Sequence, residues 1–257
     1  MLLSAQVGRW AQRFAVADAH VRLDHLLSHM IRAIAELDDG DVVFFGGTAL
    51  CRTYLTQPPW LRLSEDLDLL LTGDARGVRE RLEEGLPRLV RREFPNRSWE
   101  VAPTNVRPPT PALFRANGFL VHVQLFPATG GWAAWQRVPT AVRPVDLRYE
   151  DLPDQVELAV PTLEGFAAMK LSAWEDRRAP RDLFDLAGLT TLEAFTSQTL
   201  DIFTGLVGRP PDKSAYRLLH ESTNDGWISQ LAHQAPAVPD PAACLARVSK
   251  AVDAMRP

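Results

Sequence analysis

Two aspartates, Asp66 and Asp68, stand two residues apart at the beginning of the apolar run 67–71. Side chains two apart on a β-strand point to the same face, so the two carboxylates would lie side by side. Like charges held together repel each other, which makes the pair a costly feature if its role is only structural. Carboxylate oxygens are the ligands that hard divalent cations prefer. The pair therefore predicts a magnesium site with Asp66 and Asp68 as ligands.

A second segment, Gly46-Gly47-Thr48, directly follows the apolar run 42–45. Glycines let the backbone turn tightly and approach a ligand closely. The helix expected after them presents free N–H groups at its N-terminus, which favour phosphate. Either segment alone has an ordinary explanation, as a strand-to-helix turn or as a solvated strand end. Together they favour phosphoryl or nucleotidyl transfer, which needs phosphates on one side and carboxylate-held magnesium on the other.

Hydrophobic periodicity predicts the elements that position these segments. Residues 1–160 mix helical stretches with short apolar strands, and Asn117-Gly118 is a strong hairpin signal. Residues 161–257 are helical, with Thr162 as the cap of the first helix. The sequence therefore predicts an α+β domain over 1–160 and a helical domain over 161–257. The predicted strands are 42–45, 67–71, 112–116, 119–126 and 156–160, and the predicted helices are 18–37, 49–55, 75–94 with a kink or break at Pro87, 162–177, 180–187, one capped by Thr191, 214–221, 222–234 and 241–255.

Four motifs occur in a fixed order: GGTAL at 46–50, SEDLDL at 64–69, Lys170-Leu171, and RDLFDL at 181–186. As a set they resemble the AbiEii/MenT-type toxins of the DNA polymerase β-like nucleotidyltransferase superfamily, over about residues 42–190. The resemblance implies a polymerase β-like core with a mixed sheet, followed by a helical domain that contributes Lys170 and RDLFDL to the site. It also implies a toxin with an antitoxin from a neighbouring gene and, for the MenT branch, nucleotide addition to the 3′ end of tRNA.

The resemblance also implies roles for single residues. Asp66 and Asp68 would hold Mg²⁺, with room for two ions, and Lys170 would neutralise the triphosphate of the incoming NTP. Asp182 or Asp185 would complete the site, or would position Lys170 and the acceptor. The remaining nucleotide-binding residues implied in this way are Gly46, Gly47, Thr48, Ser64 and Arg177.

The residues themselves leave some of these roles open. Lys170, Trp174 and Arg177 share one helix face, which suits a phosphate and a base but is also typical of a solvated face with a half-buried Trp. Asp185 stands four residues after Arg181, the spacing of an ordinary helix ion pair. Asp182, in the first turn of the same predicted helix, has a favourable interaction with the helix dipole whatever its further role.

One position departs from the family pattern. Polymerase β-like enzymes use a third carboxylate on a neighbouring strand, and the expected slot in the strand 119–126 contains Gln124. Glutamine neither takes up a proton nor supplies a charged ligand. Three explanations stand: the site works with two carboxylates, Asp182 or Asp185 substitutes, or the strand is aligned wrongly. His122 on the same strand face is a further candidate base, although a lone strand histidine is more often structural.

Bulk properties narrow the function classes. The formal net charge of −4 argues against a protein coated in positive charge for nucleic acid, although local basic patches remain compatible with it. The sequence has no apolar run of about 18 residues and no signal-peptide pattern, and Cys51 and Cys244 suggest no disulfide framework. We therefore expect a cytoplasmic protein. Two alternatives stay open: a nucleotidyltransferase that modifies a protein or a small molecule, and a catalytically inactive nucleotide-binding regulator.

Overall fold

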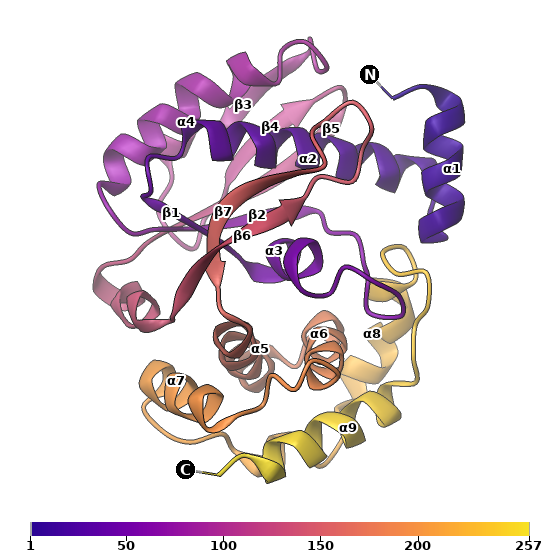
Figure 1. The fold of residues 1–257 in the computed structure, drawn as a ribbon, viewed down its shortest axis with the longest axis vertical. Helices are drawn as coiled ribbons and strands as arrows, with labels where there is room; N and C mark the ends of the chain where they lie inside the picture. Colours follow the sequence, from indigo (N-terminus) through magenta and orange to yellow (C-terminus); the bar gives the residue numbers. More distant parts are fainter. Residues whose placement is uncertain (1, 257) are drawn as a thin grey trace.

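Seven strands form one mixed sheet in the computed structural model, which describes residues 2–256 (Figure 1). The strand order is β3-β4-β5-β2-β1-β7-β6. β2 pairs in parallel with β5, and β1 pairs in parallel with β7, whereas the other neighbours are antiparallel. The mixed sheet expected from the sequence is thus confirmed. The strands are β1 (Val42–Phe45), β2 (Asp66–Leu71), β3 (Arg97–Val101), β4 (Ala112–Ala116), β5 (Phe119–Pro127), β6 (Thr140–Asp146) and β7 (Gln155–Pro161).

Helices cover both faces of this sheet (Figure 1). No helix in the described residues is long and apolar enough to cross a membrane. The helices are α1 (Ser4–Phe14), α2 (Asp18–Leu37), α3 (Gly46–Thr53), α4 (Ala75–Leu89), α5 (Leu163–Arg177), α6 (Pro180–Thr190), α7 (Ser197–Val207), α8 (Glu221–Leu231) and α9 (Pro241–Ala254), with short 3₁₀ segments at Pro103–Asn105, Gly130–Arg137 and Lys213–Tyr216.

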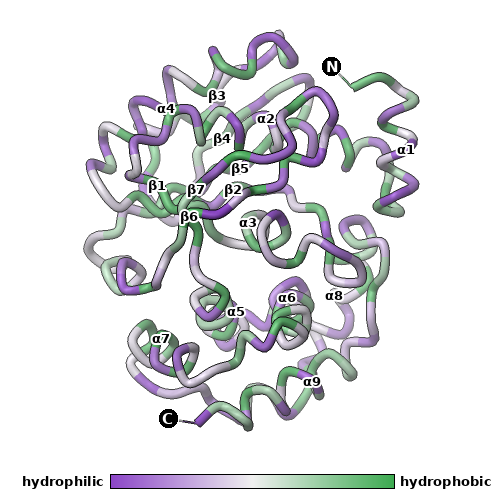
Figure 2. The backbone as a smooth tube through the Cα atoms, viewed as in Figure 1, coloured by the Kyte–Doolittle hydropathy of each residue, from purple (hydrophilic) through white to green (hydrophobic). Residues whose placement is uncertain are grey.

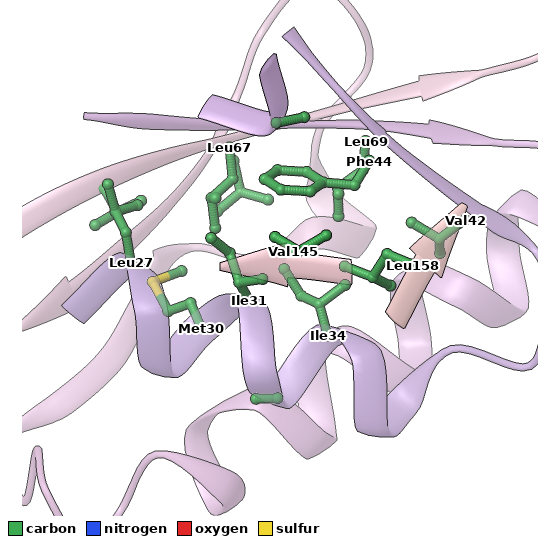
Figure 3. Close-up of a cluster of buried hydrophobic side chains, with 14 of the residues drawn as sticks. Leu27, Met30, Ile31, Ile34, Val42, Phe44, Leu67, Leu69, Val145 and Leu158 are labelled. Carbon is green, nitrogen blue, oxygen red and sulfur yellow. The ribbon is translucent and has the colours of Figure 1, made fainter. Parts of the chain in front are cut away.

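The main core lies between one face of the sheet and helices α2 and α4. Apolar residues of α2 recur at helical spacing and point toward the strands, as Figure 3 shows for Leu27, Met30, Ile31 and Ile34. Leu67 and Leu69 of β2 meet them, together with residues of β1, β6 and β7. Burial of this apolar face is the main stabilising contribution, since each fully buried Leu or Ile contributes about 1.5–3 kcal/mol.

The opposite face of the same strands carries different residues because side chains alternate along a strand. Leu67 and Leu69 belong to the main core, so Asp66, Asp68 and Leu70 point the other way. Apolar residues that share this second face form a smaller cluster with the 3₁₀ segment Gly130–Arg137 and α5. The cluster contains Val43, Phe45, Leu70, Phe126 and Ala128, with Trp132, Trp135 and Met169 packed against it.

Helices α5 to α9 pack around a core of their own. In Figure 2 they lie below the sheet, and hydrophobic and hydrophilic stretches alternate along them. Trp174 and Phe184 lie at its centre and are fully buried. The first turn of α5 nevertheless belongs to the sheet core, through Phe166 and Ala167. All strands of the described chain precede residue 162, which agrees in position with a division at 160/161, although that division stays a prediction.

The structure contains three elements that the sequence did not predict, and one predicted helix ends earlier than expected. The two edge strands β3 and β6 and the helix α1 were not predicted, and β6 includes Arg143 and Pro144 with largely exposed neighbours, so it lacks strand-like alternation. Pro87 lies inside the last turn of α4, and the helix ends two residues later instead of reaching residue 94.

The C-terminal helices contain two further corrections. Thr191 does not cap the third helix; it ends α6, and the cap of α7 is Thr196, whose side chain accepts a hydrogen bond from the Thr199 N–H. The stretch 214–221 is not an α-helix, since only the 3₁₀ turn Lys213–Tyr216 forms there. Ser and Thr cap and turn chemistry is local, so equivalent residues a few positions apart compete for it.

Candidate active site

The site begins at the turn from β1 into α3, where the helix starts directly at Gly46. Gly46 has a φ of +76°, and a Cβ at this position would lie 2.0 Å from the Oδ2 of Asp68. Both the left-handed backbone and the close approach of the carboxylate therefore require glycine. Gly46 of the turn and Asp68 of the aspartate pair, 22 positions apart in the sequence, meet at this contact.

Gly47 makes room for a second side chain. A Cβ at Gly47 would lie 2.3 Å from the Nη2 of Arg62, which is 2% exposed. Arg62 was not among the predicted site residues. The available signal was a charged residue between Leu61 and Leu63, directly before the SEDLDL motif. The glycine pair thus serves the packing of the site as well as access for a ligand.

Strand pairing places the two aspartates beside β5, the strand that has Gln124 where the family pattern has a carboxylate. Asp66 is paired with His122 and Asp68 with Gln124 in the parallel β2–β5 register. Gln124 therefore occupies the position next to Asp68 on the neighbouring strand. The Nδ1 of His122 lies 3.6 Å from the Oδ1 of Asp66. Neither aspartate forms an ion pair with a Lys or Arg in the described part of the chain.

The electrostatic state of this pair follows from its surroundings. Burial, followed by the negative charge of Asp66, raises the pKa of Asp68 to about 6, against a smaller lowering by Lys170. Burial also raises the pKa of Asp66. Two carboxylates that resist ionisation on one strand face form a site in which a cation would relieve both burial and mutual repulsion.

Thr48 and Ser64 link the turn to the aspartate strand. The Thr48 hydroxyl donates to the backbone carbonyl of Asp66, and its oxygen lies 2.6 Å from the Ser64 hydroxyl. Thr48 is only 2% exposed, so its hydroxyl fixes the beginning of β2. Ser64 is half-buried and lines the cavity described below. Of these two predicted phosphate contacts, Ser64 is the accessible one.

Lys170 lies on α5 opposite the aspartate pair and is held by two carboxylates of α6. Its Nζ is 2.9 Å from the Oδ1 of Asp182 and 2.7 Å from the Oδ2 of Asp185. Each carboxylate has a second cationic partner: Arg177 contacts Asp182 at 2.7 Å, and Arg62 contacts Asp185 at 2.8 Å. These five side chains, here called the charge ladder, alternate in sign. An ammonium has three N–H donors, so one donor of Lys170 remains for a ligand.

The ladder keeps all its members ionised. Burial opposes the charge of Asp182, but Lys170 and Arg177 outweigh it and lower the pKa of Asp182 to about 2. The pKa of Asp185 is lowered against the same burial by Arg62 and Lys170. The pKa of Lys170 is raised by Asp185 and Asp182 despite burial. Both carboxylates are fully buried and paired with Lys170 and an arginine.

The polar residues surround one cavity of about 250 Å³. A second cavity of about 190 Å³ adjoins it and has aromatic walls from Phe45, Phe126 and Trp135. The two share Gly47, Asp68, Gln124, Lys170 and Arg177. A third cavity, of about 540 Å³, continues from Phe126 and Trp135 toward α7. The polar cavity is lined by Gly47, Arg62, Ser64, Asp66, Asp68, Gln124, Lys170, Arg177, Ala179, Arg181 and Asp182.

The expectation that Lys170, Trp174 and Arg177 share one accessible face of α5 needs correction. Trp174 does not share an open face with Lys170 and Arg177, because it is fully buried and its indole N–H donates to the Ala215 carbonyl at 3.1 Å. Arg178 likewise turns away from the site, toward the ring of Trp174. The aromatic groups that do line the site come from β1, β5, the 3₁₀ segment after it and α5, and sequence spacing did not single out Trp135.

Comparison with known protein families shows to which family the chain belongs. A model of the AbiEii nucleotidyltransferase toxin family, described as a type IV toxin–antitoxin system, matches residues 30–246. The chain belongs to this family. It is therefore a nucleotidyltransferase enzyme and the toxin component of a toxin–antitoxin system, which implies an antitoxin partner. A comparison with curated proteins found no match.

Three solved structures have a fold similar to that of this chain. MenT4, a nucleotidyltransferase toxin from Mycobacterium tuberculosis, is 22% identical, with a TM-score of 0.66 over 98% of this chain and 89% of MenT4. A protein described as a nucleotidyltransferase from Helicobacter pylori is 14% identical, with a TM-score of 0.53 over 93% of this chain and 95% of its own. JHP933 from Helicobacter pylori gives 14% and 0.52, over 93% and 92% of the two chains.

Proposed function

We propose that this AbiEii-family enzyme transfers a nucleotide from an NTP to RNA, with the 3′ end of tRNA as the acceptor. The observation that supports nucleotide transfer most strongly is the polar cavity, in which Asp66 and Asp68 face Lys170 across the glycine turn. The tRNA acceptor rests on the resemblance to MenT-type toxins. Since NTPs and tRNA are cytoplasmic, we place the enzyme there, under control of an antitoxin encoded nearby.

The two aspartates fit Mg²⁺. Both are carboxylates on one strand face, both line the cavity, and both have raised pKa values because burial leaves their charge uncompensated. Oxygen-only donor sets of this kind suit Mg²⁺, which uses one or two protein carboxylates together with substrate phosphates. Bound there, Mg²⁺ would supply Lewis-acid stabilisation of the charge that develops on the reacting phosphate.

The opposite wall binds the phosphates in this account. The N–H groups at the start of α3 favour an anion because they have no partner within the helix. The free donor of Lys170 and the guanidinium of Arg177 reach the same cavity. Arg177 has a side chain that is 59% exposed, whereas its contact to Asp182 fixes the direction of the guanidinium. The ladder thus orients Lys170 and Arg177 and leaves some of their N–H donors available for a phosphate.

The aromatic cavity suits the base of the nucleotide. Trp135 and Phe126 stand next to Phe45, with ring centroids 5.2 Å apart for Phe45–Trp135 and 5.7 Å for Phe45–Phe126. Stacking on such rings binds any base and contributes about 1–3 kcal/mol per base. The larger third cavity, which extends to Leu206 and Arg209, has room for the end of the acceptor strand.

Transfer then proceeds by in-line displacement. The acceptor hydroxyl oxygen attacks the α-phosphorus, the bond from the α-phosphorus to the bridging oxygen of the β-phosphate breaks, and pyrophosphate leaves. Lys170 and Arg177 bind the triphosphate and stabilise the leaving charge, since preorganised cations need no reorganisation during the step. His122, whose Nδ1 lies 3.6 Å from the Oδ1 of Asp66, would accept the proton of the acceptor hydroxyl in the absence of a third carboxylate.

The test is incubation of purified enzyme with Mg²⁺, each α-labelled NTP in turn, and total tRNA. We expect label on tRNA from a preferred NTP, no label with Asp66→Ala enzyme, and no label on tRNA whose 3′ end has been oxidised with periodate. Label on oxidised tRNA would place the acceptor elsewhere on the RNA. NTP consumption without RNA labelling would indicate a protein or small-molecule acceptor, and no consumption at all would contradict the proposed transfer.

A further inference from the structure

Two histidines and an aspartate bring three ligand atoms together on the other side of the molecule's main core, between α2 and the loop that joins β6 to β7 (Figure 1). His25 and His29 lie one helical turn apart on α2 and are 4% and 5% exposed. Asp151 lies in the loop, with a side chain that is 25% exposed. The three ligand atoms lie within 4.8 Å of one another. None of the three residues lines the cavities of the active site.

The spacing of these atoms matches that of ligands around one metal ion. The Nε2 of His25 is 2.9 Å from the Oδ2 of Asp151, and the Nε2 of His29 is 3.4 Å from the same oxygen. The two Nε2 atoms are 3.1 Å apart. Ligands at about 2.0–2.1 Å from a tetrahedral Zn²⁺ lie about 3.3 Å from each other. The triangle already has nearly this size.

Hydrogen bonds within the triangle leave the two histidine nitrogens crowded. Each Nε2 atom carries either a proton or a lone pair. If both carry protons, both N–H groups can donate to the Asp151 carboxylate, but the two nitrogen atoms then lie only 3.1 Å apart with a proton on each. If only one carries a proton, the lone pair of the other faces the carboxylate. A cation at the centre accepts one lone pair from each of the three groups, so every contact becomes favourable.

The donor set also selects the kind of metal. Two imidazoles and one carboxylate suit Zn²⁺ and neighbouring transition metals, whereas Mg²⁺ and Ca²⁺ prefer oxygen ligands only. Burial of both imidazoles favours the neutral, metal-binding form. Aromatic rings fix their orientation: Phe94 lies 5.6 Å from His25 and 5.4 Å from His29, and Tyr149 lies 5.0 Å from His25, measured between ring centroids. Such packing around the ligands supports a preformed site.

We propose that His25, His29 and Asp151 bind one divalent transition-metal ion of the Zn²⁺ type, with water completing the coordination on the exposed side of Asp151. The site is structural, because the same loop holds two helices. Arg148 contacts Asp24 of α2 at 3.0 Å and donates to the Cys51 carbonyl of α3 at 2.9 Å. The ion therefore fastens α2 to the loop that supports α3, the helix that begins at the glycine turn.

The experiment uses full-length protein without a histidine tag, in an Asp66→Asn/Asp68→Asn background so that the active-site carboxylates do not compete. Metal is removed with EDTA, the chelator is dialysed away, and Zn²⁺ is titrated against a chromophoric competitor. The matched pair of variants is Asp151→Asn and Asp154→Asn, since both aspartates are exposed residues of the same loop. We expect one Zn²⁺ per chain, unchanged by Asp154→Asn and weakened about 100-fold or more by Asp151→Asn.

A second readout separates binding from misfolding. Zn²⁺ should raise the Tm of the Asp154→Asn protein and leave that of the Asp151→Asn protein unchanged, each compared with the same variant without metal. Co²⁺ should give visible absorption bands of a low-coordinate site only when Asp151 is present. Equal Zn²⁺ affinity in the two variants, or no Zn²⁺ binding in either, would overturn the proposal. Neither result bears on nucleotide transfer, which is measured separately in the wild-type enzyme.

Discussion

Four aspartates lie in one site, yet they form two pairs in opposite electrostatic states. Asp66 and Asp68 have no Lys or Arg ion pair among the described residues, and their pKa values are raised, that of Asp68 to about 6. Asp182 and Asp185 each contact two cations, and their pKa values are lowered, that of Asp182 to about 2. Burial is the largest influence on all four, so the partners decide the difference.

Asp66 and Asp68 lack a Lys or Arg partner among the described residues, whereas Asp182 and Asp185 are each paired with two cations. A partly buried carboxylate pair without cations is unfavourable for folding and favourable for binding a metal ion. A buried carboxylate between two cations is a fixed support, because removing it leaves buried positive charge uncompensated. We therefore propose that the open pair, Asp66 and Asp68, binds metal and takes part in catalysis, and that the ladder positions Lys170.

The largest expected effect is on catalysis by the open pair. Asp68→Ala should lower nucleotide transfer by about 1,000-fold or more, since metal stabilisation of the transition state contributes several kcal/mol. Transfer of α-labelled nucleotide to RNA measures the loss. The control is Glu157→Ala, an exposed carboxylate of β7, which should leave transfer unchanged. Normal turnover by the Asp68→Ala enzyme would remove the open pair from the mechanism.

The next effect is on stability of the ladder. Asp185→Ala should lower the free energy of unfolding by about 3 kcal/mol or more, because Arg62 is then buried without a carboxylate partner. Urea unfolding at pH 7.5 measures it, with Arg76→Ala as the matched control, since that exposed arginine pairs only with Glu80 on the surface of α4. A cost of the same small size in both variants would show that the ladder is not the support described.

A third, smaller effect concerns pH. The pKa of Asp68 is about 6 in the folded protein, above its ordinary value, so the unfolded chain loses this proton first as pH rises from about 4 to 6. Folding stability therefore falls across this window, and the penalty stays above pH 6. Asp68→Asn should remove it and stabilise metal-free protein at pH 7.5 by about 2 kcal/mol. Urea unfolding in EDTA at pH 4.5 and 7.5 should show a gain only at the higher pH; an equal gain at both would contradict the assignment.

The smallest expected effect is on the KM values for NTP and RNA, and it tests which of the two aromatic cavities binds the base of the NTP. Trp135 lines both of them, whereas Trp132 lines only the larger one. Trp135→Ala should raise the KM for NTP about tenfold, as expected for the loss of one stacking contact. Trp132→Ala should leave the KM for NTP within about twofold and raise the KM for the RNA acceptor. Equal NTP effects in both variants would place the base outside the smaller cavity.

Much of this site was predictable from local sequence. The glycine turn, the same-face aspartates and the Gln124 slot follow from strand periodicity and motif order, and the structure places them as expected. The Thr162 cap was also correct, because its side chain accepts a hydrogen bond from the Gly165 N–H at the start of α5.

What the sequence did not reveal depends on contacts between distant segments. The bidentate contact of Arg62 with Asp185 joins residues 123 apart, and no local pattern encodes it. Trp174 was expected on an accessible helix face, either to meet a base or to lie half-buried, but α7 and the 3₁₀ turn at Lys213–Tyr216 cover its helix. The edge strand β6 lacks clear alternation, because its first three residues are all exposed. The edge strand β3 alternates between partly buried and exposed residues but has no fully buried residue.

The central claim, that the open pair and not the ladder receives the metal, is tested most directly by calorimetric titration of Mg²⁺. The titration uses enzyme with a non-transferable NTP analogue and compares wild type, Asp68→Asn and Asp182→Asn, each checked for folding by its Tm. We predict that Mg²⁺ binding is lost in Asp68→Asn and retained in Asp182→Asn. Binding retained in Asp68→Asn and lost in a folded Asp182→Asn protein would contradict the account.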